Sequence, residues 1–314
     1  MTTTEKYQER GGGNGMKGKR NIARRKETLW GWIFVVPACM GLLIYIILPM
    51  IYSLAISFCS WDIISSPQFV GLQNYRTLFT TDPHFMNSCF VTLKYTLIFV
   101  PSMLFITFVI ALLLNVKQLK GKGLWRVLIY IPSIVPIMAS SALWTFIYDP
   151  TNGLLNNLLA PFGIHEDWIF DKHMVLPCIA VMGIWGAGNT IMINLSGFGS
   201  IQQELYEAVD IDGGNWRARL VYVTLPMMSP LIFYNLVMAL IGTLQTFTQG
   251  YVMTNGGPEN ASNFYMLYLY DNAFNYNRMG LACAQSWILF LVIALLTIVL
   301  FRTSGWVYYG GDAE

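Results

Sequence analysis

Residues 207–226 read EAVDIDGGNWRARLVYVTLP, and this stretch decides how the rest of the chain is organised. It is polar, it contains two adjacent glycines, and it lies between two strongly apolar segments. A segment this polar is not stable in hydrocarbon, where charged groups have no water to solvate them. We therefore expect residues 207–226 to project from a membrane into water and to meet a partner there.

The composition of the whole chain is typical of a membrane protein. Of its 314 residues, 55% are hydrophobic and only 11% are charged, whereas a soluble domain has about a quarter charged residues. Six apolar segments each have roughly the 20 residues that a helix needs to cross a bilayer. They are residues 29–58, 90–114, 127–147, 174–195, 230–248 and 283–301. The predicted fold is an all-α integral membrane protein with six transmembrane helices, and residues 207–226 lie between the fourth and the fifth.

The two ends of the chain are polar, and we expect both to lie outside the membrane. Residues 1–28 are basic and glycine-rich, which predicts a disordered tail. Within them, residues 13–20 resemble a phosphate-binding loop, but Arg20 stands where Ser or Thr should bind magnesium. A basic tail is therefore the simpler interpretation. Residues 29–302 form the predicted membrane domain, with a polar loop at 200–226, and residues 303–314 form a short C-terminal tail.

The distribution of positive charge predicts the orientation. With six spans both termini share one side of the membrane, and that side carries 15 of the 19 lysines and arginines. Lysine and arginine are enriched in cytoplasmic loops. We therefore expect a multi-pass protein of the cell membrane with both termini and residues 207–226 in the cytoplasm.

Reactive side chains form no recognisable site of their own. The five cysteines have no CxxC spacing, and the three histidines have no metal-ligand spacing. Cys59 and Cys89 lie near the same predicted membrane face, so a disulfide between them stays an open alternative. No nucleophile–base pair is evident in the spans. We expect no enzymatic activity, cofactor, metal or nucleic-acid partner for this chain.

The residues before position 207 predict where a helix begins. Ser200 and Gln203 have the spacing of a capping box, which predicts a helix from Ile201. Its apolar face is expected to carry Ile201, Leu205, Ala208 and Val209, and its acidic face Glu204, Glu207 and Asp210. Residues 213–214, both glycine, should end the helix, and a second amphipathic segment at 216–223 should follow. A surface helix that faces only water is the simpler alternative for a lone segment of this kind.

The order and spacing of Glu-Ala, Asp-Gly and Leu-Pro within residues 207–226 resemble the EAA motif of ABC importer permeases. The departures are Val209 and Gly214, where that family usually has alanine, and Leu220, where it often has phenylalanine. Residues 71–75, GLQNY, and residues 254–258, TNGGP, are similar to motifs of the carbohydrate-transporting branch. Each of these is weak alone, but their order and position relative to the spans agree with that branch.

The resemblance implies a type I ABC importer permease fold and a complex in a bacterial or archaeal cell membrane. It implies a second homologous permease subunit as heterodimer partner, a dimer of ATP-binding cassette ATPases, an extracytoplasmic solute-binding protein and a sugar as substrate. Residues 201–213 would form the coupling helix that contacts the ATPase. The residues implied in this coupling are Glu204, Glu207, Ala208, Asp210, Asp212, Gly213, Leu225 and Pro226.

The span centres contain no charged residues, which favours a neutral polar solute because transported ions usually require ionisable groups in the membrane. Uncharged polar and aromatic residues of the fourth and fifth spans are the candidates for the substrate pathway. They are Trp185, Gly186, Asn189, Thr243, Gln245, Thr246 and Gln249. The alternative is that these groups, like Asn194 nearby, hydrogen-bond between helices. Another neutral or phosphorylated polyol is an alternative substrate. A self-contained secondary transporter would need matched repeats and embedded ionisable groups, and the sequence has neither.

Overall fold

The computed structural model describes residues 30–116 and 118–308, and the chain divides into two units, Met1–Ile56 and Ser57–Glu314. The predicted basic tail, with its phosphate-loop-like residues 13–20, lies outside the described residues, as do residues 309–314.

The described part of the first unit, residues 30–56, lies in one helix that begins at Trp30 and has Ser57 as its last residue. It contains a π-helical turn, η1 (Leu43–Ile47), followed by α2 (Leu48–Ser57). Pro49 lies just after that turn and has no N–H to donate to the carbonyl of Tyr45, which accounts for the locally widened helix. Most large apolar side chains of this helix are exposed, as expected of a helix that faces lipid.

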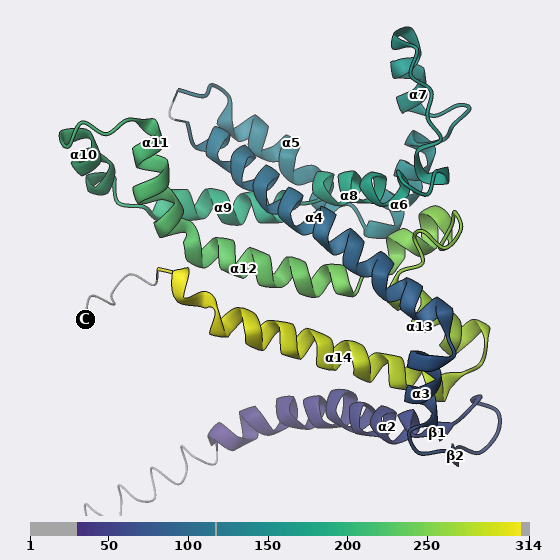
Figure 1. Ribbon diagram of the computed structural model, residues 1–314. Coiled ribbons are helices and arrows are strands. Elements are labelled where there is room, and N and C mark those ends of the chain that lie inside the picture. Colours follow the sequence, from purple (N-terminus) through teal and green to yellow (C-terminus); the bar gives the residue numbers. More distant parts are fainter. Residues whose placement is uncertain (1–29, 117, 309–314) are drawn as a thin grey trace, which may run out of the picture. The chain divides into compact units, whose positions relative to one another are not determined.

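The second unit is almost entirely helical (Figure 1). The unit starts with a two-stranded antiparallel hairpin, β1 (Cys59–Ser60) and β2 (Gln68–Phe69). One short helix, α3 (Gln73–Thr80), follows it and precedes the first long helix of the unit, α4 (Pro83–Asn115). The middle of the unit comprises α5 (Lys122–Ile134), α6 (Ile137–Ile147), α7 (Leu154–Leu159), η2 (Ala160–Phe162), η3 (Trp168–Phe170), α8 (Val175–Trp185) and α9 (Gly188–Ser200). The last part comprises α10 (Gln203–Ile211), α11 (Trp216–Ala218), η4 (Arg219–Thr224), α12 (Leu225–Leu244), η5 (Gly250–Thr254), α13 (Tyr265–Tyr270), η6 (Asp271–Asn275), α14 (Met279–Arg302) and η7 (Ser304–Trp306).

Helix α4 is the central element of this unit, because α8, α9, α12 and α13 all pack against it. Asp82 caps its N-terminus and accepts hydrogen bonds from the backbone N–H of His84 at 3.0 Å and of Phe85 at 3.2 Å. Pro83 occupies the first helical position, where the missing N–H costs nothing. The capped start lets the helix begin well before residue 90, where the apolar sequence begins.

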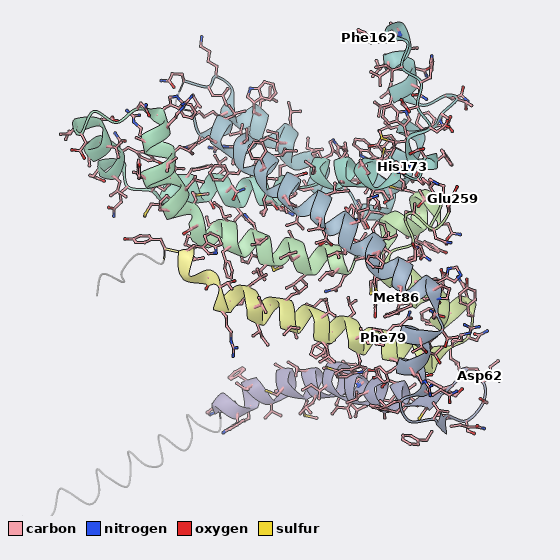
Figure 2. The ribbon with its side chains drawn as sticks, viewed as in Figure 1. Asp62, Phe79, Met86, Phe162, His173 and Glu259 are labelled. Atoms are coloured by element: carbon pink, nitrogen blue, oxygen red, sulfur yellow. The ribbon has the colours of Figure 1, made fainter. Side chains whose placement is uncertain are left out.

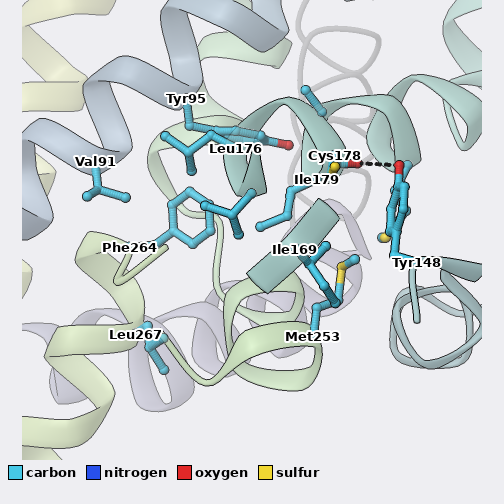
Figure 3. Packing of buried hydrophobic residues seen from close by; sticks show 13 residues of the cluster. Val91, Tyr95, Tyr148, Ile169, Leu176, Cys178, Ile179, Met253, Phe264 and Leu267 are labelled. Atoms are coloured by element: carbon cyan, nitrogen blue, oxygen red, sulfur yellow. Dashed lines mark hydrogen bonds between the residues drawn. The ribbon is translucent and has the colours of Figure 1, made fainter. Parts of the chain in front are cut away.

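The hydrophobic core lies where α4, α8 and the segment from η5 to α13 meet (Figure 3). Tyr95 and Phe264 pack edge to face there, with ring centroids 5.2 Å apart. The Tyr148 hydroxyl donates to the carbonyl of Cys178 at 3.1 Å, so this buried ring has a partner for its polar end. The first of these contacts joins α4 to the start of α13, and the second joins the end of α6 to α8.

A polar link crosses the bundle nearer its other end. The Asn235 Nδ2 of α12 donates to the Asn194 Oδ1 of α9 at 2.9 Å, and the Asn194 Nδ2 lies 3.5 Å from the Thr107 hydroxyl of α4. All three side chains are buried. For Asn194, the alternative of an interhelical hydrogen bond is therefore the one that the structure confirms.

Within residues 30–116 and 118–308, four helices are long and apolar enough to cross a membrane: Trp30–Ser57, Pro83–Asn115, Trp216–Leu244 and Met279–Arg302. Two bent pairs would raise the number to six if each pair forms one span. Helices α5 and α6 meet at 100°, at the Val135–Pro136 break, within the segment 127–147 that was predicted as one span. Helices α8 and α9 meet at 51° around residues 186–187, which the sequence did not predict.

Several predicted boundaries differ from the structure. The polar segments between the predicted spans, around residues 60–88 and 149–172, are not only loops, because they contain α3 and α7, with η2 and η3. The fifth span was predicted at 230–248, whereas the helix is continuous from Trp216 and ends at Leu244. The sixth begins at Met279 rather than at residue 283. Hydropathy marks only the apolar part of a helix, while capping and backbone hydrogen bonds extend it into polar sequence.

Residues 71–75 attach the hairpin to the bundle. Gly71 has a positive φ of 60°, and the Asn74 Nδ2 donates to the carbonyls of Ser57 at 2.8 Å and of Cys59 at 2.9 Å. The N–H of Gly280 donates to the carbonyl of Trp61 at 3.3 Å. The GLQNY motif therefore fixes a loop of backbone against the start of α14.

Residues 303–308, the described part of the predicted C-terminal tail, pack back onto α12. Val307 is buried against Phe233, and the N–H of Tyr308 donates to the Ser229 hydroxyl at 2.8 Å. The structure contains no disulfide between Cys59 and Cys89.

Candidate functional site

The polar segment 200–226 forms a helix–turn–helix at one end of the second unit, seen as α10 and α11 in Figure 1. Helix α10 begins at Gln203, with Gln202 as its N-cap. The predicted capping box and the start at Ile201 are wrong. The Ser200 hydroxyl donates instead to the carbonyl of Gly197 at 2.8 Å, because Ser200 is the last residue of α9.

The predicted end of this helix at the two glycines is confirmed. Gly213 has a φ of 75°, its N–H donates to the carbonyl of Asp210 at 3.0 Å, and the N–H of Gly214 donates to the carbonyl of Val209 at 2.8 Å. These two bonds form a Schellman motif, in which a left-handed residue closes the helix. Asn215 then caps α11 by accepting from the N–H groups of Arg217 and Ala218.

The face that α10 turns toward the bundle differs from the prediction. Tyr206 and Val209 are partly buried, while Leu205 and Ala208 are exposed. The Tyr206 hydroxyl lies 3.1 Å from the Thr224 hydroxyl of η4. Thr224 is buried, and its hydroxyl also donates to the carbonyl of Arg219 at 3.1 Å. Tyr206 therefore joins α10 to the base of α12.

The acidic residues of α10 divide into two groups. Asp210 is paired with Arg219, whose Nε donates to the Asp210 Oδ1 at 2.6 Å, so Asp210 braces the turn between the two helices. Glu207 is exposed, and its Oε1 accepts from the Gln203 Nε2 at 2.9 Å. Glu204 and Asp212 are exposed as well. Asp210 is exposed too, and Glu204, Glu207 and Asp212 are the carboxylates here that form no ion pair with another described residue.

Gly213 is also exposed, and a Cβ built there would have no neighbour within 4 Å. Leu225 and Pro226 follow the π-helical turn η4 within the helix that is continuous from Trp216. Pro226 has no N–H to donate to the preceding turn, which accounts for the locally widened helix there.

A cavity of about 430 Å³ lies further along the bundle, between α4, α5, α6, α8 and α12. Five of the seven residues predicted for a substrate pathway line it: Trp185, Gly186, Thr243, Thr246 and Gln249. Asn189 and Gln245 do not line it, and both are exposed. The structure thus brings the fourth-span and fifth-span candidates together, although their segments are about 60 residues apart in the chain.

The polar groups of this cavity are uncharged. Of the described residues that line it, none is charged, and the side chains of Ser140, Thr246 and Gln249 form no hydrogen bond to another described residue. The Thr243 hydroxyl donates to the carbonyl of Ala239 at 2.9 Å and keeps its acceptor capacity. These groups have capacity to bind hydroxyl groups of a solute.

Trp185 gives the cavity an aromatic wall, and 37% of this residue is exposed. Its ring meets that of Trp144 edge to face, with centroids 5.8 Å apart. The buried Trp144 Nε1 has no hydrogen-bond partner among the described residues. An indole N–H in this position usually finds a partner. Trp144 thus leaves an unused donor behind the aromatic wall.

The sequence did not identify Tyr95, Ser133 or Ser140, which also line the cavity. The prolines at 132 and 136 were the available signal for the two serines. A proline frees backbone groups and breaks a span, and irregular backbone at membrane depth is tolerated mainly where it lines a cavity. Tyr95 lies within the apolar sequence of α4 and had no comparable signal.

The site contains no metal centre among the described residues, since no three His, Cys, Asp or Glu side chains come together in residues 30–116 and 118–308.

Solved structures of a bacterial ABC transporter share the fold of this chain. A chain of the bacterial alginate ABC transporter, crystallised in complex with an alginate pentasaccharide-bound periplasmic protein, superposes with a TM-score of 0.80. The match covers 93% of this chain and 98% of that chain at 21% identity, so it establishes a common fold.

Sequence comparison adds closer relatives. The probable ABC transporter permease protein YesP of Bacillus subtilis (strain 168) is 36% identical over 309 residues, which cover 96% of this chain and 99% of that protein. The trehalose/maltose transport system permease protein MalF of Thermococcus litoralis is 31% identical over 278 residues, covering 87% of this chain and 93% of that protein. A family model described as the binding-protein-dependent transport system inner membrane component matches residues 103–308. The chain belongs to this family of inner-membrane transport components.

Proposed function

We propose that this chain is the permease subunit of an ATP-driven sugar importer and forms half of its translocation pore. Six spans would cross the membrane, with each bent pair counted as one, and both termini would be cytoplasmic. The partners would be a second permease subunit, two ATP-binding cassette ATPases and an extracytoplasmic solute-binding protein. The names of the relatives support this, since they include permeases of maltose, lactose and arabinooligosaccharide systems.

The observation that carries the choice of sugar is the uncharged cavity with Trp185 in its wall. Sugars present apolar ring faces that stack on aromatic side chains, and hydroxyl groups that bind uncharged donors and acceptors. Trp185, Thr246 and Gln249 supply both kinds of contact. An ionic solute would leave its charge unpaired among these groups, at a high desolvation cost.

Energy would reach the cavity through α10. The exposed carboxylates of Glu204, Glu207 and Asp212, together with Ala208 and Gly213, would contact the ATPase. The Asp210–Arg219 pair and the Tyr206–Thr224 contact join α10 to the base of α12. Helix α12 begins at Leu225 and Pro226 and carries Thr243 in the cavity wall. A displacement of α10 would therefore be transmitted along one continuous helix.

Co-purification tests this proposal. The tagged chain should bring down an ATPase and a second permease, and the reconstituted complex should take up maltose, lactose or arabinotriose only with ATP and a solute-binding protein. Uptake by the purified chain alone, without ATP, would show a secondary transporter and would contradict the proposal.

Trp185→Ala should raise the sugar concentration for half-maximal uptake about tenfold or more, because it removes an aromatic stacking surface. ATP hydrolysis stimulated by the binding protein should be retained, since α10 is unchanged. Trp125→Ala is the matched control, because Trp125 is an exposed tryptophan of α5 that does not line the cavity. An unchanged half-maximal concentration in Trp185→Ala would exclude the cavity from the pathway.

A further inference from the structure

A second cavity, of about 480 Å³, lies at the end of the bundle remote from α10, where α13 and η6 are seen in Figure 1. It shares no lining residue with the cavity of Trp185. Its walls come from the start of α4, the loop after η5, and the segment from α13 to the start of α14. Glu259, labelled in Figure 2, lies on the loop that forms one of these walls. We propose that this second cavity binds a saccharide unit before it enters the cavity of Trp185.

The lining chemistry is that of a site for a neutral, hydroxyl-rich molecule. Four asparagines contribute, Asn255, Asn260, Asn263 and Asn275, and each amide both donates and accepts hydrogen bonds. Asp271 supplies one carboxylate, and Arg278 one guanidinium. These two charges balance, so the cavity has no excess charge to select an ion, apart from His84 when protonated.

Asn263 provides the observation that points to a ligand. Its side chain lines the cavity and is only 7% exposed. Its Oδ1 is fully buried and accepts no hydrogen bond from any described residue. A buried acceptor without a donor is costly, and such groups are generally satisfied by protein, water or ligand. In the structure this oxygen is closed off from the cavity, and a rotation of the Asn263 side chain would present it to a sugar hydroxyl as the missing donor.

The aromatic groups of the cavity suit a sugar as well. Tyr268 and Tyr276 both line it, and the His84 ring lies with its centroid 6.2 Å from that of Tyr268. The Arg278 guanidinium lies over the Tyr276 ring, 5.8 Å from the centroid. Rings next to amides provide apolar faces and hydrogen-bonding groups side by side, which is the combination that a saccharide requires.

The walls are held in place by their own hydrogen bonds. The Asn275 Nδ2 donates to the Asp271 Oδ1 at 2.7 Å, and the Tyr268 hydroxyl donates to the Asp82 Oδ2 at 2.6 Å. Partial burial raises the pKa of Asp271 from its usual range, as expected for a carboxyl drawn into the wall. The Ser262 hydroxyl donates to the carbonyl of Gly257 at 2.6 Å and closes the loop. Because these walls are already ordered, less conformational entropy is lost when a ligand binds.

The two cavities lie at opposite ends of one short helix, η5. Gln249 precedes η5 and lines the cavity of Trp185, while Asn255 follows η5 and lines the second cavity. Six residues of helix rise at most about 9 Å. Lining residues of the two cavities are therefore no more than about 9 Å apart along this helix. This inference rests on the proposed function for the identity of the sugar, but its site is independent.

Cysteine labelling of the complete importer in lipid nanodiscs tests the inference. Asn275→Cys places a new thiol at an exposed position of the second cavity. A membrane-impermeant maleimide reports its accessibility once the labelling of the five native cysteines, measured on the chain without this substitution, is subtracted. Maltose, lactose and arabinotriose are the probes. A sugar at twice its dissociation constant should slow labelling about threefold by mass action.

A second substitution identifies the contact. In the Asn275→Cys background, Asn263→Leu should raise the half-protecting sugar concentration about fivefold to tenfold, the effect of losing one hydrogen bond. Asn157→Leu is the matched control, because Asn157 is an exposed amide of α7 outside both cavities. Labelling that none of the three sugars slows would overturn the inference, as would protection that Asn263→Leu leaves unchanged.

The outcomes separate the two proposals. ATP-driven uptake of a sugar without protection of the cysteine would overturn this inference and leave the proposed function standing. Protection of the cysteine by a sugar without any ATP-driven uptake would support this inference and contradict the proposed function. Protection by the solute-binding protein in the absence of sugar would identify the second cavity as a protein-docking surface and would overturn the saccharide site.

Discussion

Glu207→Lys is expected to reduce ATP-driven uptake by about 100-fold or more, while the protein remains folded and in the membrane. The Glu207 side chain is exposed, and its Oε1 accepts one hydrogen bond, from the Gln203 Nε2. Surface substitutions of this kind change the free energy of unfolding by no more than about 0.5 kcal/mol. Reversal of a charge that pairs across an interface costs several kcal/mol of binding, which corresponds to about 100-fold or more in affinity. The measurement is co-purification of the ATPase together with uptake in proteoliposomes.

Asp167→Lys is the matched control for this charge reversal. Asp167 is an exposed carboxylate that precedes η3, at the end of the unit opposite α10, and the substitution changes net charge by the same amount. It should leave ATPase binding and uptake unchanged. If Glu207→Lys keeps both the ATPase and the uptake, then α10 is not the coupling element, and the simpler interpretation of a helix that faces only water applies.

Gly280→Ala is expected to destabilise the folded protein by about 3 kcal/mol, at the upper end of what overpacking costs. A Cβ at Gly280 would lie 1.9 Å from the carbonyl oxygen of Cys59 and 3.3 Å from the Asn74 Nδ2. The Cys59 carbonyl is held in place by Asn74, at 2.9 Å, so it cannot move away without losing that hydrogen bond. Thermal unfolding of the purified protein in detergent measures the loss.

Gly199→Ala is the control, because its expected change in the free energy of unfolding is zero or of the opposite sign. Gly199 lies in α9, and a Cβ there would meet no atom within 4 Å. Alanine is favoured over glycine in a helix by about 1 kcal/mol, so this variant should be as stable as the wild type or slightly more stable. Equal unfolding temperatures for Gly280→Ala and Gly199→Ala would mean that the hairpin and α14 are not in close contact.

The sequence predicted the class of the fold because hydropathy is a local property. Long apolar segments, the polar stretch 207–226 and the glycine pair at its turn can each be read without knowing their neighbours. The family followed from the same stretch, and the comparison with known proteins confirms it. The left-handed conformation of Gly213 was predictable for the same reason, since it depends on backbone sterics within one turn.

The boundaries of the helices were harder to predict from the sequence. The capping box at Ser200 was wrong because Ser200 belongs to the preceding helix, α9, and its hydroxyl bonds within that helix. Tyr206 was overlooked because its role depends on Thr224, which lies 18 residues further along the chain. A spacing rule describes contacts within a helix, whereas these contacts depend on how one helix meets another.

The sequence by itself thus determined that this is a helical membrane permease of a known family and where its polar segment lies. The tertiary structure alone decided which polar side chains share a cavity: Trp185, Thr246 and Gln249 line one together, while Asn189 and Gln245 do not. It also placed Asn263 in a second cavity that no motif had indicated. The physical reason is that apolar segments and turns are set by near neighbours along the chain. A cavity, in contrast, is enclosed by helices that are distant in sequence. The shape of the cavity of Trp185 depends on the bends at residues 135–136 and 186–187.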